Sequence, residues 1–199
     1  MNILTDKLPE GVKVNGTFFY LNTDFRAGVE FEEMLEKGEE NIFALLRPYF
    51  PGGCPEDIAG AFEAAVTFYC CGERKTEEST TKTKRAYSFS VDADAIFADF
   101  WQFYKIDLST EQLHWFVFRS LLMGLPEESG FKKRVYYRTC ELKDLPKKEK
   151  ERIGKIRKAI NIEQEERSGK KTLADRDAQM LAYVQKRNKE INKGGGLNG

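Results

Sequence analysis

Aromatic side chains are concentrated in one short stretch of this sequence, residues 86–123. The stretch holds ten of the chain's 25 aromatic residues and both of its tryptophans. Each ring brings a large apolar surface, and a chain can carry so many this close together only if helix packs against helix. The ten are Tyr87, Phe89, Phe97, Phe100, Trp101, Phe103, Tyr104, Trp115, Phe116 and Phe118. This stretch therefore predicts the centre of a helical core.

Two helices are expected here, and each is apolar on two faces. Asp92 or Asp94 can cap the first helix, and Ser109 with Gln112 three residues later has the spacing of a capping box for the second. In the first, Ile96, Phe100 and Phe103 oppose Phe97, Trp101 and Tyr104; in the second, Leu113, Phe116, Val117 and Leu121 oppose Trp115, Phe118 and Leu122. Such a helix is either buried among several neighbours or shows one face to a partner.

Both interpretations give candidate residues. We expect Trp115 in the core and a partner surface around Trp101 and Phe118, because aromatic residues dominate binding hot spots. The candidate partner-binding residues are Trp101, Tyr104, Trp115 and Phe118, together with Ile153, Ile156 and Ile160 in the charged tail.

The amino-terminal part predicts a hairpin followed by helices. Val12 and Val14 lead into Asn15-Gly16, a pair that readily takes positive φ at both centres of a tight turn, and residues 17–21 supply the returning strand. Asp24 precedes a helix that ends near Gly38. Further helices are expected over residues 42–46, before Pro48, and over residues 56–71.

The rest of the chain is polar and charged. Residues 72–85 contain no apolar side chain and predict a flexible, solvent-exposed linker. We expect residues 86–145, the aromatic helical core, to pack with residues 1–71 as one domain. Residues 146–199 predict a charged helical tail with a Gly-rich disordered end, on which narrow isoleucine stripes suit a helix laid on a partner, on its own domain or in a short coiled coil. The expected fold class is thus mostly α, with a small amino-terminal β-hairpin.

Charge and cysteine content limit the class of protein. The formal charge is zero, but residues 1–146 carry a net charge of −7 and residues 147–193 one of +7. Nucleic-acid binding is not expected, since no aromatic or Gly-rich base-reading element accompanies the basic residues of the tail. The cysteines Cys54, Cys70, Cys71 and Cys140 lack disulfide or metal spacing and predict thiols in a reducing compartment. No stretch has a leader pattern or reaches membrane-spanning length, so we expect no membrane contact and a location in the cytoplasm.

The residues that usually carry chemistry are not arranged for it. His114 is the only histidine, and it has no evident acid-base or metal-binding partner. The carboxylates Asp92, Asp94 and Asp99 lie beside one helix, where capping and solvation explain them. No nucleophile elbow, phosphate loop or dinucleotide fingerprint is present. We therefore expect no enzymatic activity, no cofactor and no metal.

The order of these parts resembles a phage family. The opening MNILTDKLPEGVKVNG with LNTDFRAGVEFEEML, then Tyr-Ser-Phe, the aromatic helix, Tyr-x-Ile-Asp-Leu and Leu-His-Trp, up to Tyr137-Arg138, are similar to the Gp-fifteen proteins of tailed phages and prophages of Gram-positive bacteria. The resemblance covers roughly the first 145 residues. It implies a tail assembly chaperone, encoded beside the tape measure protein and binding that protein while tube subunits assemble.

The resemblance leaves several points open. The tail tube protein and a second copy of the chain are further candidate partners, and a chaperone is expected in the bacterial host cytoplasm and not in the mature virion. The alternative from another class is a structural tail or neck component of the virion.

Overall fold

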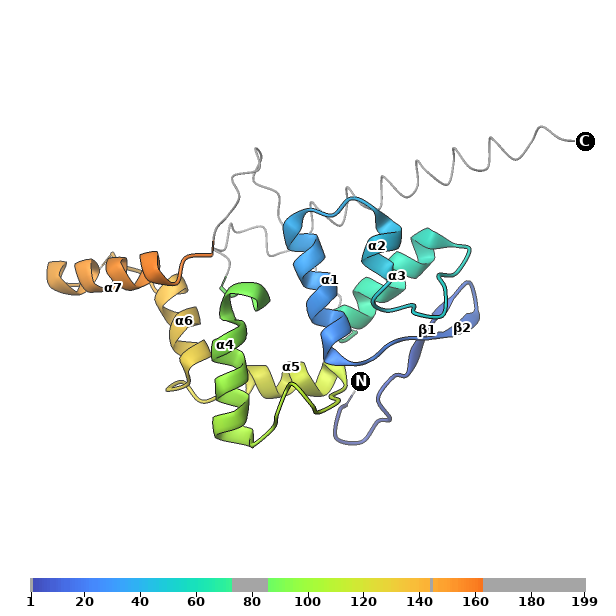
Figure 1. Cartoon of the computed structure of the whole chain (residues 1–199), viewed down its shortest axis with the longest axis horizontal. Helices are drawn as coiled ribbons and strands as arrows, with labels where there is room; N and C mark the ends of the chain where they lie inside the picture. Colours follow the sequence, from blue (N-terminus) through green and yellow to red (C-terminus); the bar gives the residue numbers. More distant parts are fainter. Residues whose placement is uncertain (1, 73–85, 144, 163–199) are drawn as a thin grey trace, which may run out of the picture. The chain divides into compact units, whose positions relative to one another are not determined.

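The computed structural model of the chain describes residues 2–72, 86–143 and 145–162. The chain divides into two compact units, of which the first has residues 2–72 described and the second residues 86–143 and 145–162. The fold is mostly helical with a small antiparallel hairpin near the amino terminus, which confirms the expected fold class. Figure 1 shows the described elements of both units.

The first unit opens with the expected hairpin. β1 (Gly11–Val14) pairs antiparallel with β2 (Thr17–Tyr20), and Val14 lies opposite Thr17 across the turn. Asn15 and Gly16 both take positive φ, 48° and 82°, as a two-residue turn of this kind requires. The Asn15 side-chain amide donates to the Asp57 carboxylate at 2.8 Å, which ties the turn to the residue that precedes the helix beginning at Ile58.

Among its described residues, 2–72, the first unit also forms three helices: α1 (Phe25–Lys37), α2 (Ile42–Leu46) and α3 (Ile58–Tyr69). Local caps define α1, because the Asp24 carboxylate accepts the Arg26 N–H and Gly38 closes the helix at φ 71°. The core of this unit is aromatic. The rings of Phe31 and Tyr49 lie 5.2 Å apart and both residues are fully buried.

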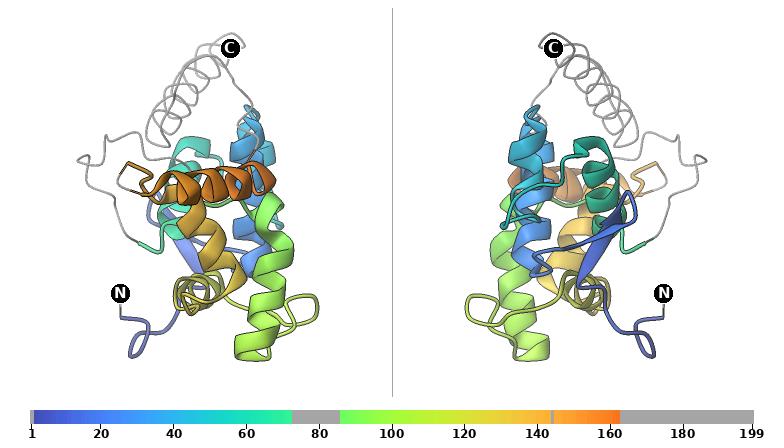
Figure 2. Two further views of the ribbon diagram at one scale, coloured as in Figure 1. Left: turned by 90° about the vertical axis from the view of Figure 1, so that its left-hand side faces the viewer. Right: turned by 90° about the vertical axis from the view of Figure 1, so that its right-hand side faces the viewer.

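The described residues of the second unit, 86–143 and 145–162, form five helical segments. They are α4 (Phe89–Asp99), the π-helical turn η1 (Phe100–Tyr104), α5 (Trp115–Met123), α6 (Gly130–Thr139) and α7 (Lys147–Ala159). Within this unit α6 lies beside α4, and α7 crosses α6 near the carboxyl end of α6 (Figures 1 and 2). The buried face of α4 and η1 carries Phe89, Ile96 and Phe100.

Both caps expected for the aromatic helices are wrong. α4 begins after Ser88, four or more residues before the expected start, and the Asp92 carboxylate accepts the Ser88 N–H at 3.1 Å from inside the helix. α5 begins after His114, whose ring Nδ1 accepts the Phe116 N–H at 3.1 Å. Ser109 instead donates to Asp107 within the preceding turn.

The domain boundaries stay predictions in part. Of the expected linker, residues 73–85 lie outside the described residues, and the packing of residues 86–145 with 1–71 as one domain stays a prediction. The charged tail is helical where it is described, in α7, whereas residues 163–199, with the expected Gly-rich end, lie outside the described residues.

Candidate partner-binding site

The structure separates the two tryptophans. Trp101 is 54% exposed on η1, whereas Trp115 on α5 is 1% exposed. Trp115 therefore belongs to the core, where the sequence analysis placed it. The expectation that Phe118 lies at a partner surface is wrong, because Phe118 is also 1% exposed.

A stack of rings explains why Phe118 is inside. The Phe118 ring stacks on Phe100 at 5.2 Å and on Trp115 at 5.9 Å, with an interplanar angle of 22° in both pairs. Phe89 closes the same cluster, with its ring 6.2 Å from Trp115 and 6.1 Å from Phe118. The side of α5 that carries Trp115, Phe118 and Leu122 thus faces the core of the unit.

Tyr104 leaves the face that it was expected to share with Trp101. In a regular α-helix, Tyr104 would lie on nearly the same face as Trp101, because the two residues are three positions apart. The wider π-helical turn of η1 changes this spacing, and the Tyr104 hydroxyl donates to the Leu121 carbonyl on α5 at 2.8 Å. Burial of the phenol raises the pKa of Tyr104. Tyr104 therefore ties η1 to α5 and is only half exposed.

Trp101 instead shares a surface with Phe97, one turn earlier on α4. Phe97 is 42% exposed and was not among the candidate residues, although its i, i+4 spacing to Trp101 is visible in the sequence. Small or polar exposed residues surround the two rings. We call this surface the Phe97–Trp101 face; it consists of Ser90, Ala93, Asp94, Phe97, Ala98 and Trp101.

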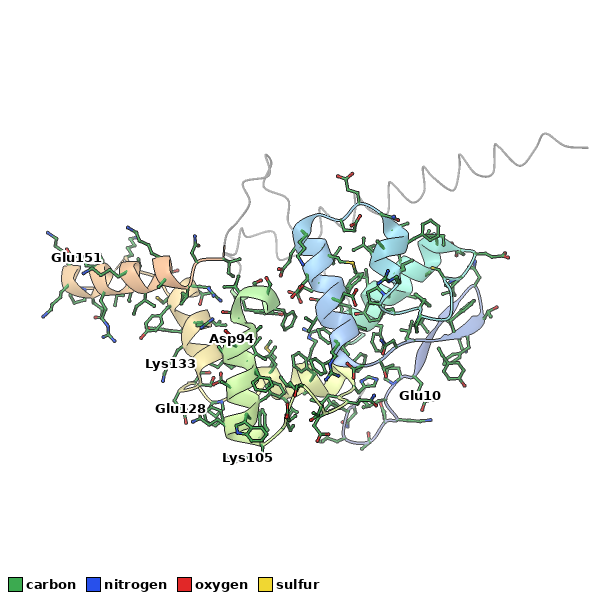
Figure 3. All side chains as sticks on the ribbon, in the orientation of Figure 1. Glu10, Asp94, Lys105, Glu128, Lys133 and Glu151 are labelled. Carbon is green, nitrogen blue, oxygen red and sulfur yellow. The ribbon has the colours of Figure 1, made fainter. Side chains whose placement is uncertain are left out.

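Buried contacts hold the helix that carries this face. The Asp99 carboxylate accepts the N–H groups of Gly130 at 3.0 Å and Phe131 at 2.7 Å, and so caps the first turn of α6. The Gly130 Cα is close to this carboxylate, since a Cβ added there would lie 3.5 Å from Asp99 Oδ1. The opposite side of α4 from Phe97 is therefore fixed to α6. Figure 3 labels two charged residues of this part of the chain: Asp94, which lies on α4, and Lys105, which directly follows η1.

A second buried carboxylate, Asp92, joins three parts of the unit. Its oxygens accept from Arg138 at 2.8 Å and from Arg134 at 3.1 Å, and Asp92 is fully buried. Arg138 also donates to the carbonyls of Ile160, at 2.9 Å, and Ala86, at 3.3 Å. One guanidinium thus connects α4, α6 and the end of α7.

We expect this cluster to make stability depend on acid pH. Burial acts to raise the pKa of Asp92, but the hydrogen bonds from Arg138, Ser88 and Arg134 together hold the pKa below its ordinary value of 3.8. Because the native pKa is depressed, the stabilisation is present above the ordinary carboxyl pKa and is lost as pH falls through the native one. Urea unfolding of the parent and of Asp92→Asn at a series of pH values tests this. The stability gap between the two proteins is expected to shrink toward acid pH, and a gap that does not change with pH contradicts the expectation.

The isoleucine stripe of α7 lies against its own unit. Ile153 is buried, and Ile156 and Ile160 are half-buried. Arg157 donates to the carbonyls of Tyr137, at 2.6 Å, and Cys140, so it satisfies the end of α6. Of the alternatives for the tail, packing on its own domain describes α7. Ile153 is therefore covered, and the opposite side of α7 is the one that faces solvent.

Two residues of types that often carry chemistry are His114 and Cys54. The ring of His114 caps α5, as described above. Burial raises the pKa of the Cys54 thiol to about 11, so that the group is protonated at neutral pH and is a poor nucleophile. The described part of the chain contains no helix that is both long and apolar enough to cross a membrane.

Comparison with known proteins gives one match. The model of a family described as "Bacteriophage Gp15 protein" matches residues 4–162, which include every described element of both units. Neither a curated protein nor a solved structure matches the chain.

Proposed function

The chain belongs to the Bacteriophage Gp15 protein family, and from this we propose that it is a tail assembly chaperone that binds the tape measure protein. Membership supports a phage-related structural or morphogenetic role, in a family that is not a known enzyme family. The proposed chaperone acts in the host cytoplasm, keeps a long and apolar partner from aggregating, and leaves before the virion is complete. The tail tube protein is a second proposed partner.

The observation that supports the proposal is the Phe97–Trp101 face. A domain with a ring stack already buried in its core still leaves Trp101 and Phe97 about half exposed, on one side of one helix. Exposed aromatic residues at helical spacing are the usual anchors for an apolar partner. Such a face suits transient cover of an apolar segment, which is what a chaperone of this kind provides.

Replacement of Trp101 by Ser tests the face directly. We expect Trp101→Ser to lower affinity for the tape measure protein about thirtyfold, roughly 2 kcal/mol, and to lower its soluble fraction on co-expression. The melting temperature is expected to stay near that of the parent, because half of the ring is already in water. The measurements are the soluble fraction of co-expressed tape measure protein, affinity by titration, and thermal unfolding.

Tyr136→Ser is the matched control, since Tyr136 on α6 is 55% exposed in the same unit. It is expected to bind like the parent. Equal solubility of the tape measure protein with and without this chain contradicts the chaperone role. Mass spectrometry of purified virions distinguishes the chaperone from the alternative, a structural tail or neck component. The structural component is present in fixed copy number, whereas a chaperone is absent.

A further inference from the structure

We infer that the Phe97–Trp101 face binds an amphipathic α-helix whose apolar stripe is flanked by lysine or arginine. The inference rests on the proposed function and specifies the kind of segment that is recognised there. Three features of the second unit carry it: the secondary structure around the face, the small residues beside the rings, and the distribution of charge.

The secondary structure favours a helical partner. The described residues of the second unit, 86–143 and 145–162, form helices and connecting turns and contain no strand, so they offer no open sheet edge to an extended segment. Beyond its first turn, α4 bonds its main-chain N–H groups within the helix. An extended partner would leave its own N–H and C=O groups without partners wherever the rings cover them, whereas a helix satisfies its own.

The small residues let a helix approach closely. Ala93 and Ala98 are exposed on the two sides of the aromatic pair, so the rings of Phe97 and Trp101 project above their surroundings. The two Cα positions are separated by about 6 Å along the helix axis, one turn at about 1.5 Å per residue. Two projecting rings with this spacing fit between apolar side chains placed at i, i+3 or i+4, and i+7 on a facing helix.

The sequence segment that contains the face is acidic. Residues 86–129 contain two basic residues, Lys105 and Arg119, and seven acidic ones, Asp92, Asp94, Asp99, Asp107, Glu111, Glu127 and Glu128. Asp92 and Asp99 are buried and take part in the contacts with α6. The other five are exposed or half-exposed, and Asp94 lies in the face itself, one turn before Phe97.

The basic residues of α6 lie on the other side of α4. The flank of α4 that meets α6 carries Asp92, Ala95 and Asp99: Arg134 bonds Asp92, and Gly130 lies against Ala95 and Asp99. Phe97 is two residues beyond Ala95, about 200° around the helix, so it points away from α6. The charged residue within the Phe97–Trp101 face is therefore Asp94, and a partner with cations beside its apolar stripe complements it.

Two designed peptides test the inference without depending on the tape measure protein. Each is an amphipathic helix of about 20 residues with the same leucine stripe, flanked by lysine in one and by glutamate in the other. We expect the full-length protein to bind the lysine-flanked peptide about tenfold more tightly at low salt, with the difference decreasing as salt rises. Equal binding of both peptides, or preference for the glutamate-flanked one, overturns the inference.

Charge reversal at Asp94 tests whether the preference for the lysine-flanked peptide arises at the Phe97–Trp101 face. Asp94→Lys is expected to remove most of the tenfold preference, whereas Glu149→Lys, the same change at an exposed site on α7, leaves it intact. An unchanged preference in Asp94→Lys overturns the placement of the site.

The two proposals can fail separately. If the tape measure protein is not bound, the proposed function is wrong, whatever the peptides do. If it is bound through segments with acidic flanks, the chaperone role stands and the inference about the segment is wrong.

Discussion

Arg138→Met is expected to lower the free energy of unfolding by about 3–5 kcal/mol, the cost of leaving a buried charge without its partner. Arg138 is 7% exposed and provides the donors to Asp92, Ile160 and Ala86. Without it, the Asp92 carboxylate stays fully buried with only Arg134 and the Ser88 N–H as donors. Two main-chain carbonyls lose a donor at the same time.

Arg134→Met is the matched control, because it removes the other arginine of the same cluster. The Arg134 side chain is 33% exposed and donates to Asp92 and to the Val91 carbonyl. Since water can replace part of this contact, we expect a loss of about 1 kcal/mol. Urea unfolding of both variants measures the difference, and equal losses for Arg138→Met and Arg134→Met would show that burial of the pair does not determine its contribution.

Trp115→Ala is the second large effect, with an expected loss of about 3–5 kcal/mol in stability. The indole is stacked on Phe118 at 5.9 Å and touches the Phe89 ring, and the Arg119 guanidinium lies over it at 5.8 Å. Removing the ring leaves a cavity beside the stack, since the neighbours on α4 and α5 cannot all move in to fill it. A folded Trp115→Ala protein with undiminished stability would contradict the packing described here.

The second tryptophan gives both a control and a spectroscopic readout. Trp101→Ala removes a ring that is 54% exposed, so we expect a loss of about 1 kcal/mol or less. Because the chain has two tryptophans, each variant leaves a single emitter. The emission of Trp115 in Trp101→Ala is expected to be blue-shifted and resistant to acrylamide quenching, and that of Trp101 in Trp115→Ala is expected to be red-shifted and readily quenched.

Elements with local signals were predictable from the sequence. Asn15-Gly16 placed the hairpin turn, and Asp24 and Gly38 placed the two ends of α1, because a cap or a positive φ depends on residues only a few positions away. The aromatic stretch likewise identified a helical core with Trp115 inside it. In the candidate site, Trp101 was identified from residue type alone.

The other features of the fold and of the candidate site depended on contacts between residues far apart in the sequence. Asp92 was expected to be able to cap α4, but a buried arginine 46 residues later, Arg138, binds it. Asp99 was assigned to capping and solvation beside its own helix, but it caps a different helix, α6. Phe118 and Trp101 are both aromatic residues on apolar helices, and only the packing of α5 on Phe89 and Phe100 decided that one is buried and the other exposed. The sequence by itself thus determined the hairpin, the three described helices of the first unit and the need for an aromatic core. Which rings fill that core, and which are left to form the Phe97–Trp101 face, was decided by tertiary contacts, because hydrophobicity acts on every ring alike and only the positions of the neighbouring helices distinguish them.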